Sequence, residues 1–187
     1  TRINMNPEIS LAKLATTENF QQKKLRTFTD KQLDQIGALR QLDPEKIFEM
    51  KVVSSVLPFR VNQYVVDELI DWQNIPSDPI FQLTFPQRGM LEEDTFTKMA
   101  DLLRAGASAK QIRTLANELR RGLNPHPAEQ QTLNVPTLNG HHLMGIQHKY
   151  PETVLFFPSQ GQVCHSYCTF CFRWAQFVGD PELKFST

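Results

Sequence analysis

Apolar side chains recur every three or four positions over much of residues 30–123, which predicts a series of amphipathic helices. The clearest start is Asp43-Pro44-Glu45, which combines a capping carboxylate, a proline at the first helical position and an acidic first turn. That helix is expected to end at Pro58, and another is expected to open at Arg60-Val61-Asn62. Three further helices are expected to begin at Asp30, near Leu91 and after Ser108.

Two segments follow a different pattern. Phe81, Leu83 and Phe85 alternate with other residues, which favours either a short strand or an extended loop. Residues 153–157 (T-V-L-F-F) are apolar on both faces, which predicts a buried parallel strand. The chain is therefore expected to contain a helical region at 1–123, an irregular segment rich in proline and glycine at 124–150, and an α/β segment at 151–187.

Composition narrows the class of protein. The 187 residues are 40% apolar, enough to build a core, and 20 basic side chains balance 20 acidic ones. This balance argues against a general binder of nucleic acid or anionic membranes, and no apolar run is long enough to span a bilayer. Because the chain begins at Thr1 and ends soon after its cysteines, we expect it to be part of a longer protein.

All three cysteines lie within eight residues, with the spacing C-x₃-C-x₂-C formed by Cys164, Cys168 and Cys171. Three such close thiols cannot all pair, so the pattern favours metal ligation in a reducing, cytoplasmic compartment. Structural zinc usually takes four ligands, and so does a four-iron cluster. Three cysteines would therefore leave one iron open to a small molecule. The alternative is a helical binding module stabilised by zinc.

The spacing C-x₃-C-x-aromatic-C, with Phe170 at the aromatic position, resembles the signature of the radical S-adenosylmethionine (SAM) superfamily. Three segments ahead of it resemble, in order, the lysine 2,3-aminomutase family: residues 58–64 (P-F-R-V-N-Q-Y), 78–80 (D-P-I) and 148–155 (H-K-Y-P-E-T-V-L). The resemblance covers roughly residues 55–180. Thr153 replaces an arginine of the family, which leaves open an amino acid or amine other than lysine as substrate.

This resemblance implies an α/β fold, in which a helical N-terminal region leads into the first strand and cluster loop of a radical SAM partial (β/α) barrel. It also implies a 4Fe-4S cluster held by the three cysteines, with SAM bound at the open iron. The implied reaction is reductive cleavage of SAM followed by a 1,2-amino shift on an amino acid or amine. The family's strands that bind SAM lie beyond the cluster loop, so the 187 residues alone are expected to be inactive.

The resemblance assigns further roles to individual residues. Lys149 and Tyr150 correspond to positions near pyridoxal phosphate (PLP), the second cofactor of the family. Arg173 corresponds to an arginine that binds the substrate carboxylate, and its planar fork suits that role. A salt bridge that caps a following helix is the alternative role for Arg173. The expected electron donor is a flavodoxin or ferredoxin, and the family leaves room for a homo-oligomer.

Overall fold

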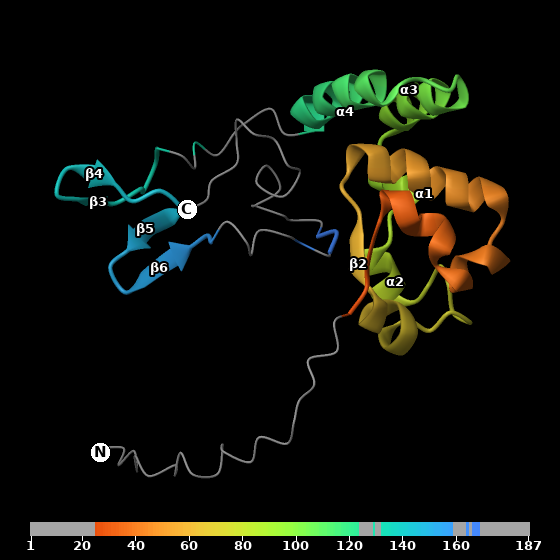
Figure 1. Ribbon diagram of the computed structural model, residues 1–187, viewed down its shortest axis with the longest axis horizontal. Helices are drawn as coiled ribbons and strands as arrows, with labels where there is room; N and C mark the ends of the chain where they lie inside the picture. Colours follow the sequence, from red (N-terminus) through yellow and green to blue (C-terminus); the bar gives the residue numbers. More distant parts are fainter. Residues whose placement is uncertain (1–24, 124–128, 130–131, 159–163, 165, 169–187) are drawn as a thin grey trace, which may run out of the picture.

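The computed structural model of the protein describes residues 25–123, 129, 132–158, 164 and 166–168. Figure 1 shows a helical unit formed by residues 25–123 and, on the other side of the molecule, two β-hairpins within residues 132–158. Within the described ranges, no helix is both long and apolar enough to cross a membrane.

The helical unit contains short strands as well as helices. Its elements are, in order, β1 (Thr27–Thr29), the 3₁₀-helices η2 (Asp30–Gln35) and η3 (Gly37–Gln41), α1 (Pro44–Val56), β2 (Arg60–Asn62), the π-helix η4 (Val65–Leu69), α2 (Pro79–Thr84), the 3₁₀-helix η5 (Arg88–Met90), α3 (Glu93–Arg104) and α4 (Ala109–Leu123).

Helix α1 begins and ends where the sequence predicts. The Asp43 carboxylate accepts a hydrogen bond from the backbone N–H of Glu45 at 2.8 Å, and Pro44 occupies the first turn. The helix ends at Val56, two residues before Pro58. Helices α3 and α4 are also confirmed, and the Ser108 hydroxyl accepts from the backbone N–H of Gln111 at the start of α4.

Helix α1 lies between two core clusters and contributes side chains to both. The first core cluster consists of Phe28, Leu33, Ile36, Leu39, Met50, Phe59, Val61, Val66, Ile70, Phe81 and Phe85. The second core cluster consists of Val52, Val53, Val56, Leu91, Phe96, Met99, Ala100 and Ala116, and it joins α1 to α3 and α4. Both cores are apolar, so hydrophobic burial stabilises this unit.

The segment that begins at Asp30 differs from the prediction of one helix. Leu33, Ile36 and Leu39 are all buried, but Leu33 and Leu39 lie on two successive 3₁₀-helices, and Ile36 is the extended residue that caps both. Thr29 rather than Asp30 is the N-terminal cap of the first.

The prediction that a helix opens at Arg60 is wrong. Residues 60–62 form strand β2, which pairs antiparallel with β1, with Phe28 opposite Val61. The helical turns begin only after Asn62, whose side-chain oxygen accepts a hydrogen bond from the backbone N–H of Val65 at 2.9 Å. Asn62 thus ends the strand and caps the turn that follows.

The prediction of a short strand or extended loop at Phe81, Leu83 and Phe85 is also wrong. These residues belong to helix α2 and its C-terminal cap. Phe81 and Phe85 are separated by one helical turn and stack with ring centroids 5.0 Å apart, while Leu83 is exposed. The helix starts at Asp78-Pro79, the same combination of cap and proline that begins α1.

The segment expected to be irregular, 124–150, contains three strands in its described part, residues 132–150. The hairpin β3 (Thr137–Leu138) and β4 (His141–His142) precedes β5 (Ile146–Tyr150), which pairs antiparallel with β6 (Thr153–Phe156). Strand β6 is confirmed as a strand, but all four of its residues are exposed rather than buried, and its described partner, β5, is antiparallel rather than parallel. The link from Tyr150 to Thr153 spans only two residues, which suits an antiparallel hairpin, whereas a parallel pair needs a long crossover.

Candidate functional site

The described part of the cysteine loop carries two free thiols. Cys164 and Cys168 are both exposed, and the Cys164 thiol lies 3.6 Å from the carbonyl oxygen of Ser166. Cys171 and two other predicted site residues, Phe170 and Arg173, lie outside the described residues. The two described thiols are therefore accessible to a metal or cluster from solvent.

The loop is attached to the helical unit through Tyr167. The backbone N–H of Tyr167 donates to the carbonyl oxygen of Leu83 at 2.7 Å, and its phenol O–H faces the carbonyl oxygens of Pro58 at 3.2 Å and Leu57 at 3.5 Å. The Tyr167 ring packs against the first core cluster. In Figure 1 the short blue segment that contains it lies beside β2, away from β6.

The environment of Tyr167 keeps its phenol protonated. Burial, and to a smaller extent the negative charge of Asp30, raises the pKa of Tyr167 far above its ordinary value. A protonated phenol is a hydrogen-bond donor, which matches the two carbonyl acceptors that it faces. Tyr167 is not among the residues predicted from the sequence; its only sequence signal is a large aromatic side chain between two cysteines.

The donor set fits a soft metal or an iron–sulfur cluster, because thiolates are the preferred protein ligands of both. In the described residues, the donors that fit are the thiols of Cys164 and Cys168, which form no disulfide and come from one loop. Across the described ranges, no group of three or more His, Cys, Asp or Glu side chains is arranged to hold a metal ion. A complete ligand set would therefore need a residue from outside these ranges, and the sequence supplies Cys171.

Lys149 and Tyr150 lie together at the end of β5. The Lys149 ammonium is 5.3 Å from the centroid of the Tyr150 ring, and both side chains are exposed. Within the part of the chain that the structure describes, no hydrogen bond or ring contact joins either residue to Cys164 or Cys168. The structure thus brings these two residues to each other but not to the two described cysteines, Cys164 and Cys168.

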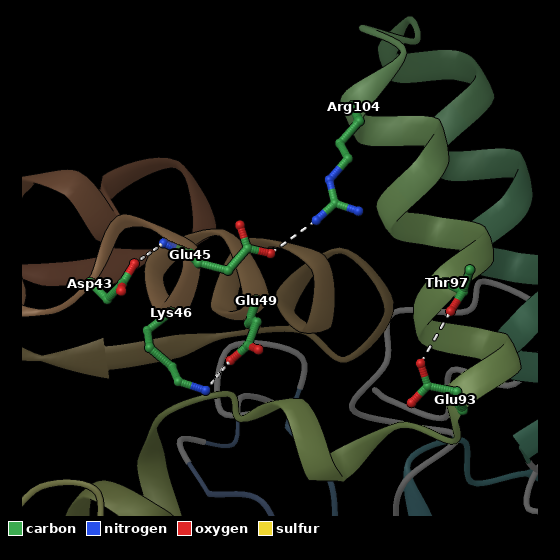
Figure 2. Close-up of polar contacts among 7 residues, drawn as sticks. All are labelled: Asp43, Glu45, Lys46, Glu49, Glu93, Thr97 and Arg104. Carbon is green, nitrogen blue, oxygen red and sulfur yellow. Dashed lines mark hydrogen bonds and ion pairs between the residues drawn. The ribbon is translucent and has the colours of Figure 1, made fainter.

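Away from the loop, charged side chains form exposed pairs along α1. Figure 2 shows Lys46 paired with Glu49 at 2.9 Å, and Arg104 of α3 paired with Glu45 at 2.9 Å. The hydrogen bond from Lys46 to Glu49 and the charge of Glu49 raise the pKa of Lys46, which keeps it protonated. Solvent screens such exposed pairs, so each contributes little to stability and we interpret them as structural.

A cavity of about 270 Å³ lies between α1, the loop around residues 75–76 and η5. Its walls include Met50 and Phe81 from the first core cluster, and Lys46 and Glu49 line it as well. None of the predicted site residues that the structure describes, Lys149, Tyr150, Cys164 and Cys168, lines this cavity. It is therefore separate from the candidate site at the cysteine loop.

The chain is similar to a protein of Aquifex aeolicus (strain VF5) named "Putative L-lysine 2,3-aminomutase". The two are 27% identical over 160 residues, which cover 86% of this chain and 31% of the relative. The chain thus spans about a third of the length of this curated relative. No protein-family model matches the chain. No solved structure matches it either. This similarity supports a distant relationship to a protein that is named as an aminomutase.

Proposed function

We propose that the chain belongs to a radical SAM enzyme of the lysine 2,3-aminomutase type and contributes its helical N-terminal region and cluster loop. The observation that carries this proposal is the C-x₃-C-x₂-C spacing of Cys164, Cys168 and Cys171. The relative from Aquifex aeolicus supports it independently, because the similarity runs through 86% of the chain. The exposure and free state of the Cys164 and Cys168 thiols are compatible with cluster ligation.

In this proposal the three cysteines ligate a 4Fe-4S cluster, and Phe170 lies beside them. When bound, the cluster supplies the electron that cleaves SAM and so starts the reaction. Arg173 binds the carboxylate of an amino acid substrate, for which a bidentate guanidinium is well suited. A flavodoxin or ferredoxin reduces the cluster.

PLP is the second proposed cofactor, at Lys149 and Tyr150. The exposure of both side chains leaves them accessible to a ligand, and an ammonium next to an aromatic ring suits an anionic, planar cofactor.

Strand β6 is the proposed first strand of the partial barrel. Its Val154, Leu155 and Phe156 side chains are 55%, 49% and 60% exposed, an apolar surface that the outer helices and interior side chains of a barrel would cover.

A zinc-stabilised helical module receives less support from the described residues. The helical unit has two apolar core clusters of its own, and neither includes a cysteine or histidine. A zinc ion is therefore not required to explain how this unit folds.

The experiment is an assay for 5′-deoxyadenosine on the full-length protein that would contain this chain and the SAM-binding strands, after anaerobic reconstitution with iron and sulfide and reduction in the presence of SAM. We expect the wild-type protein to release 5′-deoxyadenosine and Cys168→Ala to release none, because it lacks a cluster ligand. Arg173→Ala should retain the cluster, yet lose most of the stimulation by an amino acid substrate. Equal 5′-deoxyadenosine release by wild type and Cys168→Ala would contradict the proposed role of the loop.

A further inference from the structure

Tyr167 lies between the two described cysteines, but its environment is opposite to theirs. Cys164 and Cys168 are exposed, whereas the Tyr167 ring packs against the first core cluster. Among the described residues of the loop, 164 and 166–168, Tyr167 is the one that enters the core and attaches the loop to the helical unit. The position of that attachment decides where the flanking thiols lie.

The attachment uses backbone acceptors at the ends of two helices. Leu57 is the C-terminal cap of α1, Pro58 follows it, and Leu83 lies in the last turn of α2. Carbonyl groups at helix C-termini have no partner within their own helix, so they need donors from elsewhere. Tyr167 supplies its phenol O–H to Leu57 and Pro58 and its backbone N–H to Leu83.

We propose that Tyr167 is a positioning residue that fixes the cysteine loop on the helical unit and thereby sets the placement of Cys164 and Cys168. The attachment stands on the contacts of Tyr167 alone; its consequence for an iron–sulfur cluster rests on the function proposed above. Because coupling between two sites is reciprocal, a bound cluster also stabilises the helical unit through the same contacts.

The attachment itself is tested in the metal-free chain by hydrogen–deuterium exchange. The Tyr167 amide is expected to exchange slowly in the wild type, because it donates to Leu83. Tyr167→Phe keeps the ring and the backbone bond and should retain protection in the loop. Tyr167→Ala removes the ring, and we expect exchange in residues 166–168 to become at least about tenfold faster. Fast exchange of this segment in the wild type would overturn the proposal.

The consequence for the cluster is tested by the rate of iron release to a chelator from the reconstituted protein. Tyr167→Phe loses its phenol hydrogen bonds, and we expect release about three- to tenfold faster than in the wild type. Tyr167→Ala should release iron faster still. It should also broaden the low-temperature EPR signal of the reduced cluster, because the loop then samples more conformations.

Phe96→Ala is the matched control. Phe96 is a buried aromatic residue of the second core cluster, so its loss destabilises the helical unit without touching the contacts of Tyr167. We expect Phe96→Ala to lower thermal stability while leaving iron release and the EPR line shape as in the wild type. If Phe96→Ala accelerates iron release as much as Tyr167→Ala, the role of Tyr167 is only structural and the proposal fails.

The two proposals fail in different ways. A wild-type protein that takes up no iron, but protects Tyr167 from exchange, would contradict the proposed function and leave the attachment confirmed. A wild-type protein that holds a cluster and releases iron at the same rate as Tyr167→Ala would contradict the positioning role and leave the proposed function intact.

Discussion

At the scale of single residues, two aspartates perform the same task in different surroundings. Asp43 and Asp78 each precede a proline and cap a helix, α1 and α2 respectively. Asp43 is exposed, whereas Asp78 is only 5% exposed and accepts hydrogen bonds from two backbone groups, Phe81 N–H at 2.7 Å and Asp71 N–H at 3.2 Å. A buried backbone N–H left without an acceptor lowers the free energy of unfolding more than an exposed one, because water cannot replace the lost acceptor.

The first stability prediction compares these two caps. Asp78→Ala leaves two backbone donors without an acceptor, and we expect the free energy of unfolding to fall by about 2–3 kcal/mol. Asp43→Ala is the matched control and should cost about 0.5–1 kcal/mol, since water reaches the exposed donor. Urea denaturation of both variants measures the difference. Equal losses would show that burial of Asp78 does not matter.

At the scale of elements, α4 closes the C-terminal end of α1. The Arg120 guanidinium donates from Nε to the carbonyl oxygen of Val56 at 2.6 Å. Its Nη2 donates to the carbonyl oxygen of Ser55 at 3.4 Å. These carbonyls belong to the last turn of α1 and have no partner within the helix. The contact joins residues more than sixty positions apart, so it fixes the packing of α4 on α1.

Removal of this contact is the second stability prediction. Arg120→Ala should lower the free energy of unfolding by about 1.5–3 kcal/mol, the range for hydrogen bonds to a charged group. The neighbouring Arg121 is exposed, and Arg121→Ala should change stability by less than about 0.5 kcal/mol. Thermal unfolding monitored by circular dichroism distinguishes the two. Similar losses for both arginines would mean that helix propensity, and not the contact with α1, sets the effect.

Local signals in the sequence were sufficient to locate some elements and not others. The caps at Asp43 and Ser108 act within one turn of chain, so α1 and α4 could be predicted. Strand β2 forms because Val61 lies opposite Phe28, a partner more than thirty residues away, and no local pattern at Arg60 reveals that pairing. For α2, the cap at Asp78 outweighs the alternation of Phe81, Leu83 and Phe85.

At the scale of the whole molecule, the sequence predicts which residues form the site, whereas it does not predict where the loop is attached. The cysteine spacing predicts thiol ligands, since the residue types and their separation are local properties. The attachment of Tyr167 to Leu57, Pro58 and Leu83 depends on tertiary packing, and the sequence predicted instead that strand β6 delivers the loop. The barrel and the cofactor contacts remain predictions.

The central claim is that the cysteine loop holds an iron–sulfur cluster, and elemental analysis of the anaerobically reconstituted protein tests it most directly. Because three cysteines match the ligands of one cubane cluster, we predict about four irons and four sulfides per chain in the wild type. We predict far less of both in Cys168→Ala. A colourless wild-type protein that binds one zinc ion per chain, and takes up no iron or sulfide, would contradict the claim.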